Sequence, residues 1–178
     1  MTLQAPPRPA ITELSLDQLA GWLADRNEPS YRARQIWRWL AHGAGFDAME
    51  NLPAKLRADL EESYRSSALR QLSLSRADGG LTTKLLFELD GGYTVEAVVM
   101  RYPGRSTLCI SSQVGCPIGC PFCATGKGPF GRNLKPHEIV DQAADARSQA
   151  RRQARAPAIG QSARRDIEDA RPWRQRDD

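Results

Sequence analysis

The sequence changes character near Val140, and this change limits how much of the chain can build a core. Residues 141–178 contain nine Arg, nine Ala, five Gln and seven acidic residues, but no Lys, Leu, Val, Phe, Tyr or Cys. A segment with so few large apolar residues buries too little surface to offset the entropy that its backbone loses on ordering. We therefore expect a disordered or frayed helical tail over 141–178 and a folded protein over 11–140.

The folded part has room for about one ordinary domain. The sequence has no run of about 18 to 20 apolar residues, the length that a membrane-spanning helix requires. Met1 is followed by Pro-rich sequence rather than by a basic segment and an apolar stretch. We expect a cytoplasmic protein without a membrane partner. The formal net charge of +4 is compatible with a nucleic-acid partner but does not require one.

Three helices are predicted in the first third of the chain. Ser15 and Gln18 form a capping-box pattern before a segment of helical apolar spacing. A second helix is expected after Pro29, with apolar residues at i, i+3, i+4 and i+7 and with Gly43 at its end. A third helix is expected to start near Pro53. Together these segments predict a helical domain.

The predicted second helix also has a basic face, which consists of Arg32, Arg34, Gln35 and Arg38. Such a face could bind a phosphate backbone. A helix exposed to solvent displays charged residues in any case. The sequence therefore leaves RNA binding by this face open.

After Ser67 the apolar spacing changes from helical to alternating, which predicts a small antiparallel meander. The segments 81–89 and 93–100 are rich in β-forming residues, and each follows an Asp-Gly-Gly sequence typical of tight hairpin turns. The apolar run at 107–111 is typical of a buried strand. This strand leads directly into a cysteine-rich loop.

The loop contains Cys116, Cys120 and Cys123 at the spacing C-x3-C-x2-C. In a chain expected in the cytoplasm, this spacing favours metal ligation over disulfides. A structural zinc site needs four ligands and would have to recruit His137 or Cys109. An iron–sulfur cluster held by three cysteines keeps one iron open, as a catalytic cluster requires. The spacing favours the cluster and leaves zinc as the alternative.

These residues resemble the radical S-adenosylmethionine enzymes, whose signature loop is C-x3-C-x-aromatic-C, with Phe122 as the aromatic residue. Within that superfamily the sequence resembles the RlmN branch, and the helical segment resembles the N-terminal accessory domain of that branch. The matching segments are 31–33 (YRA), 35–37 (QIW), 106–116 (STLCISSQVGC), 122–126 (FCATG) and 131–134 (GRNL).

The resemblance implies cofactors and a substrate. Cys116, Cys120 and Cys123 would hold a [4Fe–4S] cluster next to Phe122, and the open iron would bind S-adenosyl-L-methionine. The implied reaction is methylation of carbon 2 of an adenine in large-subunit (23S) ribosomal RNA and in some transfer RNAs. An electron donor would reduce the cluster, and a cysteine near the C-terminus would carry the methyl group.

The resemblance also assigns roles to Glu96 and Cys109. Glu96 matches the family's proton acceptor, which lies in a Val-Glu pair. Cys109 matches a cysteine that closes a transient disulfide to release the methylated RNA. Without the resemblance, Glu96 would be a carboxylate on the exposed face of an alternating strand, and Cys109 a small buried hydrophobe.

The sequence also departs from the family pattern. No cysteine follows Cys123, so the methyl-carrying cysteine is absent, and residues 141–178 contain no strand-like run. We therefore expect a truncated version of the enzyme that is inactive alone. The alternative is a non-catalytic metal- or RNA-binding protein with a structural zinc or a labile iron–sulfur site.

The expected fold class is α+β. It combines a helical accessory domain, a small antiparallel β meander, the start of a truncated radical S-adenosylmethionine partial (β/α) barrel, and a tail. The expected boundaries are 1–10 for a flexible N-terminus, 11–67 for the accessory domain, 68–104 for the meander and linker, 105–140 for the start of the core with the cluster loop, and 141–178 for the Arg/Ala/Gln-rich tail.

Overall fold

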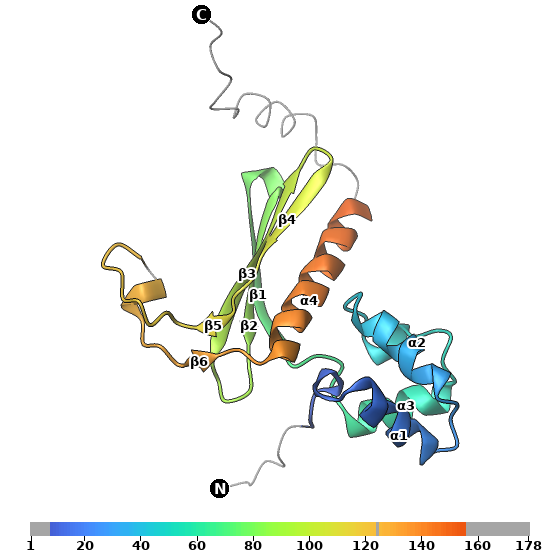
Figure 1. Cartoon of the computed structure of the whole chain (residues 1–178). Helices are drawn as coiled ribbons and strands as arrows, with labels where there is room; N and C mark the ends of the chain where they lie inside the picture. The colour runs from blue at the N-terminus through green and yellow to red at the C-terminus, as the bar shows by residue number, and fades with distance from the viewer. Residues whose placement is uncertain (1–7, 124, 156–178) are drawn as a thin grey trace, which may run out of the picture.

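A computed structural model describes residues 8–123 and 125–155 of the chain, and within this part the fold is α+β (Figure 1). A helical domain precedes a four-stranded sheet, and one long helix lies against both (Figure 1). The elements are α1 (Leu16–Ala24), α2 (Tyr31–Leu40), α3 (Ala54–Ser63), β1 (Arg70–Ala77), β2 (Thr82–Glu88), β3 (Thr94–Tyr102), β4 (Arg105–Cys109), β5 (Gln113–Val114), β6 (Arg132–Asn133) and α4 (Pro136–Arg155), with short 3-10 turns at Ile11–Glu13, Phe46–Ala48, Asp78–Gly80 and Thr125–Lys127.

The helical domain confirms the three predicted helices. At the start of α1, the Ser15 hydroxyl accepts a hydrogen bond from the Gln18 backbone N–H at 3.1 Å, and the Gln18 side chain accepts one from Ser15 N–H at 2.7 Å. This is the predicted capping box. The apolar faces of the helices pack into one core. The buried residues of this core are Ile11, Leu19, Leu23, Ala33, Ile36, Leu40, Phe46, Met49, Leu52, Leu56 and Leu60.

The sheet confirms the predicted meander. Its strand order is β1-β2-β3-β4, and each neighbouring pair is antiparallel. One face of the sheet packs against α4 and the segment before it, because alternate residues of β2 and β3 are apolar and point to that side. The core of this layer contains Leu69, Leu85, Phe87, Leu89, Val95, Ala97, Val99, Leu134 and Ala146.

The prediction of a buried strand at 107–111 is wrong. The strand β4 spans Arg105–Cys109, and each of its residues is exposed. The reason is tertiary: β4 is the last strand of the sheet and pairs only with β3. Burial of an apolar strand depends on what covers it, and the local sequence does not specify that cover. The predicted start of a (β/α) barrel stays a prediction.

The expectation of a disordered or frayed helical tail is right about a helix in the first part of the tail but wrong about its exposure to solvent. The helix α4 continues to Arg155, well beyond the predicted boundary at 140. Asp141, Gln142, Ala144 and Ala146 are buried. Alanine side chains are small enough for a helix to lie close to its neighbours, so the part of α4 beyond 140 packs without large apolar residues. Residues 156–178 lie outside the described part.

Close packing between α4 and the helical domain is visible at Gly43. This glycine has a φ of 67°, and a Cβ built on it would lie 2.5 Å from the carbonyl oxygen of Ala144. A glycine is required here for both reasons.

At the other end of the domain, Arg65 N–H donates to Pro9 O at 2.9 Å and Ala10 is fully buried, so residues 9 and 10 belong to the fold rather than to a flexible N-terminus. Within residues 8–123 and 125–155, no helix is long and apolar enough to cross a membrane.

Candidate functional site

The cysteine loop extends from a short ribbon formed by β5 and β6 (Figure 1). Two backbone hydrogen bonds close the base of the loop, from Gly131 N–H to Val114 O at 2.8 Å and from Leu134 N–H to Ser112 O at 2.9 Å. Gly115 enters the loop with a φ of 72°, and a Cβ there would overlap the backbone of Pro129. The loop is therefore held at both of its ends.

The three thiols of the loop, at Cys116, Cys120 and Cys123, are free and half-buried. Hydrogen bonds from the backbone N–H groups of Gly126 and Thr125 lower the pKa of the Cys123 thiol, and they outweigh the opposing effect of its burial. The thiolate is the form that ligates metals. Cys123 is therefore the thiol that the loop itself prepares for ligation.

The three thiols do not converge on one point. Within residues 8–123 and 125–155, no group of three His, Cys, Asp or Glu side chains is placed to hold a metal ion, and neither His137 nor Cys109 completes such a group. The chemistry of the donor set nevertheless fits an iron–sulfur cluster, since three soft thiol ligands lie on one short loop. Ile118 and Phe122 are 75% and 88% exposed. The tip of the loop thus has few packing contacts that would oppose a rearrangement on binding.

The structure brings Glu96 and Cys109 to the same side of the sheet. Glu96 lies on β3 between core-facing neighbours, so its side chain is on the face opposite α4. Cys109 pairs with Val98 in the register of β3 and β4. The side chains of paired residues share a face, which makes Glu96 and Cys109 diagonal neighbours, typically about 7–8 Å apart. Cys109 is exposed, so it is not the buried hydrophobe that the sequence alone suggested.

Lys84 is a part of this face that the sequence analysis missed. Its ammonium Nζ lies 3.0 Å from Glu96 Oε1, and both side chains are about half exposed. The register pairs Lys84 with Val98, which places the lysine diagonally opposite Glu96. Only the strand register shows this contact. An ion pair as exposed as this one contributes about 0–1 kcal/mol.

Gln142 fixes the backbone between this face and the cysteine loop. Its side chain is fully buried on α4 and forms two hydrogen bonds with Ser111, from Nε2 to the carbonyl O at 2.9 Å and from the Ser111 N–H to Oε1 at 3.0 Å. The Ser111 hydroxyl donates to the Glu96 carbonyl at 2.8 Å. No sequence pattern indicates this role, because Gln142 lies in the segment expected to be unpacked.

Arg132 and Glu138 hold the other end of the loop. Two hydrogen bonds of 2.7 Å join the guanidinium group of Arg132 to the carboxylate of Glu138, which also accepts one from Lys135 N–H at 2.7 Å. Burial alone would raise the pKa of Glu138, but the bonds from Arg132 and Lys135 outweigh it and leave the pKa below its usual value. The first turn of α4 is thereby tied to β6.

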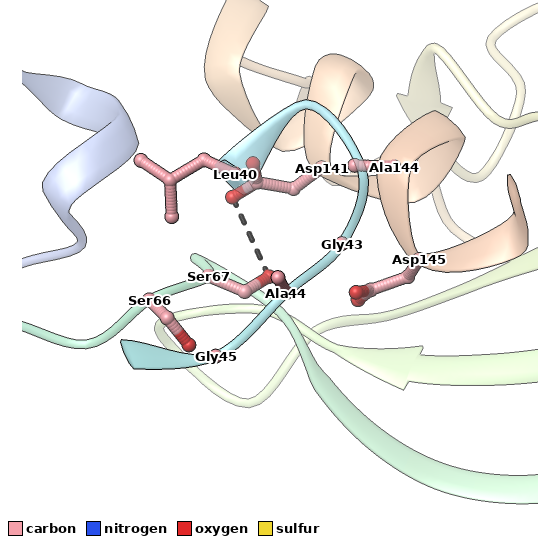
Figure 2. A pocket seen from close by; sticks show the side chains of 9 residues that line it. All are labelled: Leu40, Gly43, Ala44, Gly45, Ser66, Ser67, Asp141, Ala144 and Asp145. Atoms are coloured by element: carbon pink, nitrogen blue, oxygen red, sulfur yellow. Dashed lines mark hydrogen bonds between the residues drawn. The ribbon is translucent and has the colours of Figure 1, made fainter. Parts of the chain in front are cut away.

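A cavity of about 30 Å³ lies where the helical domain meets α4 (Figure 2). Asp141 lines it and accepts hydrogen bonds from Thr12 Oγ1 at 2.8 Å and from Ala68 N–H at 2.7 Å. Burial raises the pKa of Asp141. Burial and the charge of Asp141 raise the pKa of Asp145 to about 6. The predicted site residues do not line this cavity, so we regard it as a joint between the two parts of the fold.

Comparisons with known proteins agree with the resemblance. A family model described as the ribosomal RNA large subunit methyltransferase N-terminal domain matches residues 10–65. Proteins named "Probable dual-specificity RNA methyltransferase RlmN" match in Geobacillus kaustophilus, with 42% identity over 139 residues (77% of this chain, 38% of that protein), and in Carboxydothermus hydrogenoformans, with 38% identity over 135 residues (75% and 40%).

A solved structure is similar as well. The crystal structure of a radical SAM methyltransferase from Sphaerobacter thermophilus superposes with a TM-score of 0.73 at 42% sequence identity, and it covers 83% of this chain and 44% of that chain. This chain spans about two fifths of the length of the curated relatives it matches (38% and 40%). Residues 10–65 of the chain therefore belong to the RlmN N-terminal domain family, and over about three quarters of its length the chain matches the N-terminal portion of RlmN proteins.

Proposed function

We propose that this chain carries the cluster loop and the accessory domain of an enzyme that methylates carbon 2 of adenine in large-subunit ribosomal RNA and in transfer RNA. The observation that carries this proposal is the set of three free thiols on a loop fixed at both ends, at the spacing C-x3-C-x2-C. The words "dual-specificity" in the names of the relatives support two classes of RNA substrate.

In this proposal Cys116, Cys120 and Cys123 hold a [4Fe–4S] cluster, beside Phe122. When bound and reduced by an external electron donor, the cluster supplies the electron that cleaves S-adenosylmethionine. The lowered pKa of Cys123 supports its role, because it favours the thiolate, which is the form that ligates metals.

Glu96 and Cys109 are the proposed catalytic residues. Glu96 would accept the proton from the adenine ring carbon. The Cys109 thiol would form a disulfide with the methyl-carrying cysteine of the complete enzyme while the bond between that cysteine's sulfur and the transferred carbon breaks, and this sequence has no such cysteine after Cys123. Their shared position on the open face of the sheet supports these roles, because RNA can reach both side chains. Lys84 has to release the carboxylate of Glu96 first. This release costs little free energy, because both side chains of the ion pair are about half exposed.

The cluster assignment is tested by anaerobic reconstitution of the full chain with iron and sulfide. We expect a brown protein that contains both elements in equal amounts. Cys120→Ala should lose them, while Cys109→Ala should retain them, since Cys109 lies outside the loop. Unchanged iron content in the Cys120→Ala variant would contradict the ligand assignment. Transfer of labelled methyl groups to unmodified ribosomal RNA, with a relative from Geobacillus kaustophilus as positive control, tests the activity.

The alternative function is that of a non-catalytic metal- or RNA-binding protein with a structural zinc or a labile iron–sulfur site. The same three thiols would be the ligands in that case, although no fourth ligand lies beside them in the described part of the chain. That protein would be colourless after anaerobic purification and would hold zinc in a one-to-one ratio. Cys120→Ala would then lose zinc rather than iron and sulfide.

A further inference from the structure

A groove of about 330 Å³ lies between α1 and α2 in the helical domain. Leu16 from α1 lines it together with Arg34, Trp37 and Arg38 from α2. Leu16 is 38% exposed, and both arginines are exposed. In Figure 1 α2 and the cysteine loop lie on opposite sides of the molecule, so the groove is separate from the predicted catalytic site.

The groove is positively charged and its charges are unpaired. α2 contains three arginines and no acidic residue. Arg32 is engaged with Glu28, at 3.5 Å, and with the carbonyl of Asn51, at 2.9 Å. The side chains of Arg34 and Arg38, in contrast, make no hydrogen bond or ion pair with any residue in the described part of the chain, and the His42 ring, at 2.6 Å, contacts only the backbone carbonyl of Arg38. They lie one helical turn apart, so both guanidinium groups can reach one extended polyanion.

The floor of the groove is apolar and aromatic. Trp37 is half-buried and lines the groove beside Leu16. Nucleobases stack on aromatic side chains.

We propose that this groove binds a single-stranded segment of RNA. Arg34 and Arg38 contact successive phosphates, and a base packs against Leu16 and Trp37. An acidic peptide would satisfy the two arginines, but it offers no flat ring for the aromatic floor. The inference rests on the proposed function for the identity of the polymer, and it adds a surface that contributes affinity rather than chemistry.

The test is fluorescence anisotropy of a labelled single-stranded RNA with the full chain, measured at several salt concentrations. The groove variant is Arg34→Glu with Arg38→Glu. The matched control is Arg147→Glu with Arg151→Glu, because these arginines are also exposed, unpaired in the described part and four positions apart, but lie on α4. Both variants change the net charge equally.

We expect the groove variant to raise Kd at least about tenfold and the control less than about threefold. The loss of two phosphate contacts should reduce the slope of log affinity against log salt by about 1.4, at about 0.7 per phosphate of a single strand. Trp37→Leu keeps an apolar floor without the ring and should raise Kd about fivefold or more, with an unchanged circular dichroism spectrum.

Equal weakening in the groove variant and the control would overturn the inference, and so would competition by polyglutamate as effective as that by unlabelled RNA. The iron content of the same samples separates this inference from the proposed function. If the wild-type chain holds the cluster but the variant with Arg34→Glu and Arg38→Glu binds RNA as well as wild type does, only the inference about the groove is refuted. RNA binding that depends on the groove in a chain without iron refutes only the proposed function.

Discussion

The replacement Gln142→Ala tests whether α4 holds the backbone between the sheet and the cysteine loop. The variant loses two hydrogen bonds to Ser111, of 3.0 and 2.9 Å, in a fully buried position. Each backbone group left unpaired costs about 1–3 kcal/mol, less where water can reach it. Because Ser111 is half-buried, we expect a loss of about 2–4 kcal/mol. That is a large share of the roughly 5–15 kcal/mol that stabilises a domain.

The assay is urea unfolding followed by circular dichroism, with Gln149→Ala as the matched control. Gln149 lies on the same helix, and its one hydrogen bond is an exposed contact with Gln71 at 3.0 Å. We expect the control to change the unfolding free energy by less than about 0.5 kcal/mol. Equal effects of the two variants would refute the claim that Gln142 has a special structural role.

Gln142→Glu sharpens the test, because a protonated carboxyl group can keep both hydrogen bonds to Ser111. An ionised carboxylate at this buried position lacks a donor for the Ser111 carbonyl, so its folded-state pKa should exceed the unfolded value of about 4.3. The variant should therefore match wild type in stability at about pH 4 and lose stability as pH rises through its folded pKa. A difference from wild type that is the same at all pH values would contradict this reasoning.

Three further predictions follow from the charges and the loop. Asp145 has a pKa raised to about 6, so ionising it lowers the unfolding free energy as pH rises from about 4 to 6. Asp145→Asn should raise the unfolding free energy by about 1–3 kcal/mol at pH 8 and weaken its dependence on pH, measured by urea titrations. Glu138 has a lowered pKa, so its contribution is fully present above about pH 4.3 and is lost as pH falls through the folded-state pKa. Glu138→Gln should therefore cost about 3 kcal/mol at pH 7 and progressively less as the pH is lowered in the same titrations. Gly115→Ala should reduce iron incorporation, because a side chain there overlaps Pro129, while Gly128→Ala, where a Cβ would lie 3.8 Å from the Thr125 carbonyl oxygen, should not.

Local chemistry made much of this fold predictable. The capping box at Ser15, the stop at Gly43 and the alternation in the strands act within a few residues, so the sequence displays them directly. The cysteine spacing is local in the same sense. The shared face of Glu96 and Cys109 was less visible, since it depends on a strand register that only the whole sheet sets.

The failures have tertiary causes. The exposure of β4 follows from its place at the edge of the sheet rather than from its apolar residues. The order of α4 beyond 140 follows from alanines that pack against the sheet and the helical domain. A prediction from composition considers only large apolar residues and therefore misses the burial of these alanines. Gln142 and Lys84 were missed because their partners lie far away in the sequence, at Ser111 and Glu96.

These long-range contacts also explain how the two parts of the fold keep their relative orientation. Successive residues of α4 hold different neighbours: Asp141 binds Thr12 and Ala68 of the helical domain and its linker, and Gln142 binds Ser111 beside the sheet. One turn of a rigid helix therefore connects the domain that carries the groove to the segment between Cys109 and the cysteine loop. An RNA held in the groove would for this reason meet Glu96 and Cys109 in a fixed orientation. Because Asp141 and Gln142 are adjacent on one helix, the two parts of the fold that they contact have little freedom to move relative to each other.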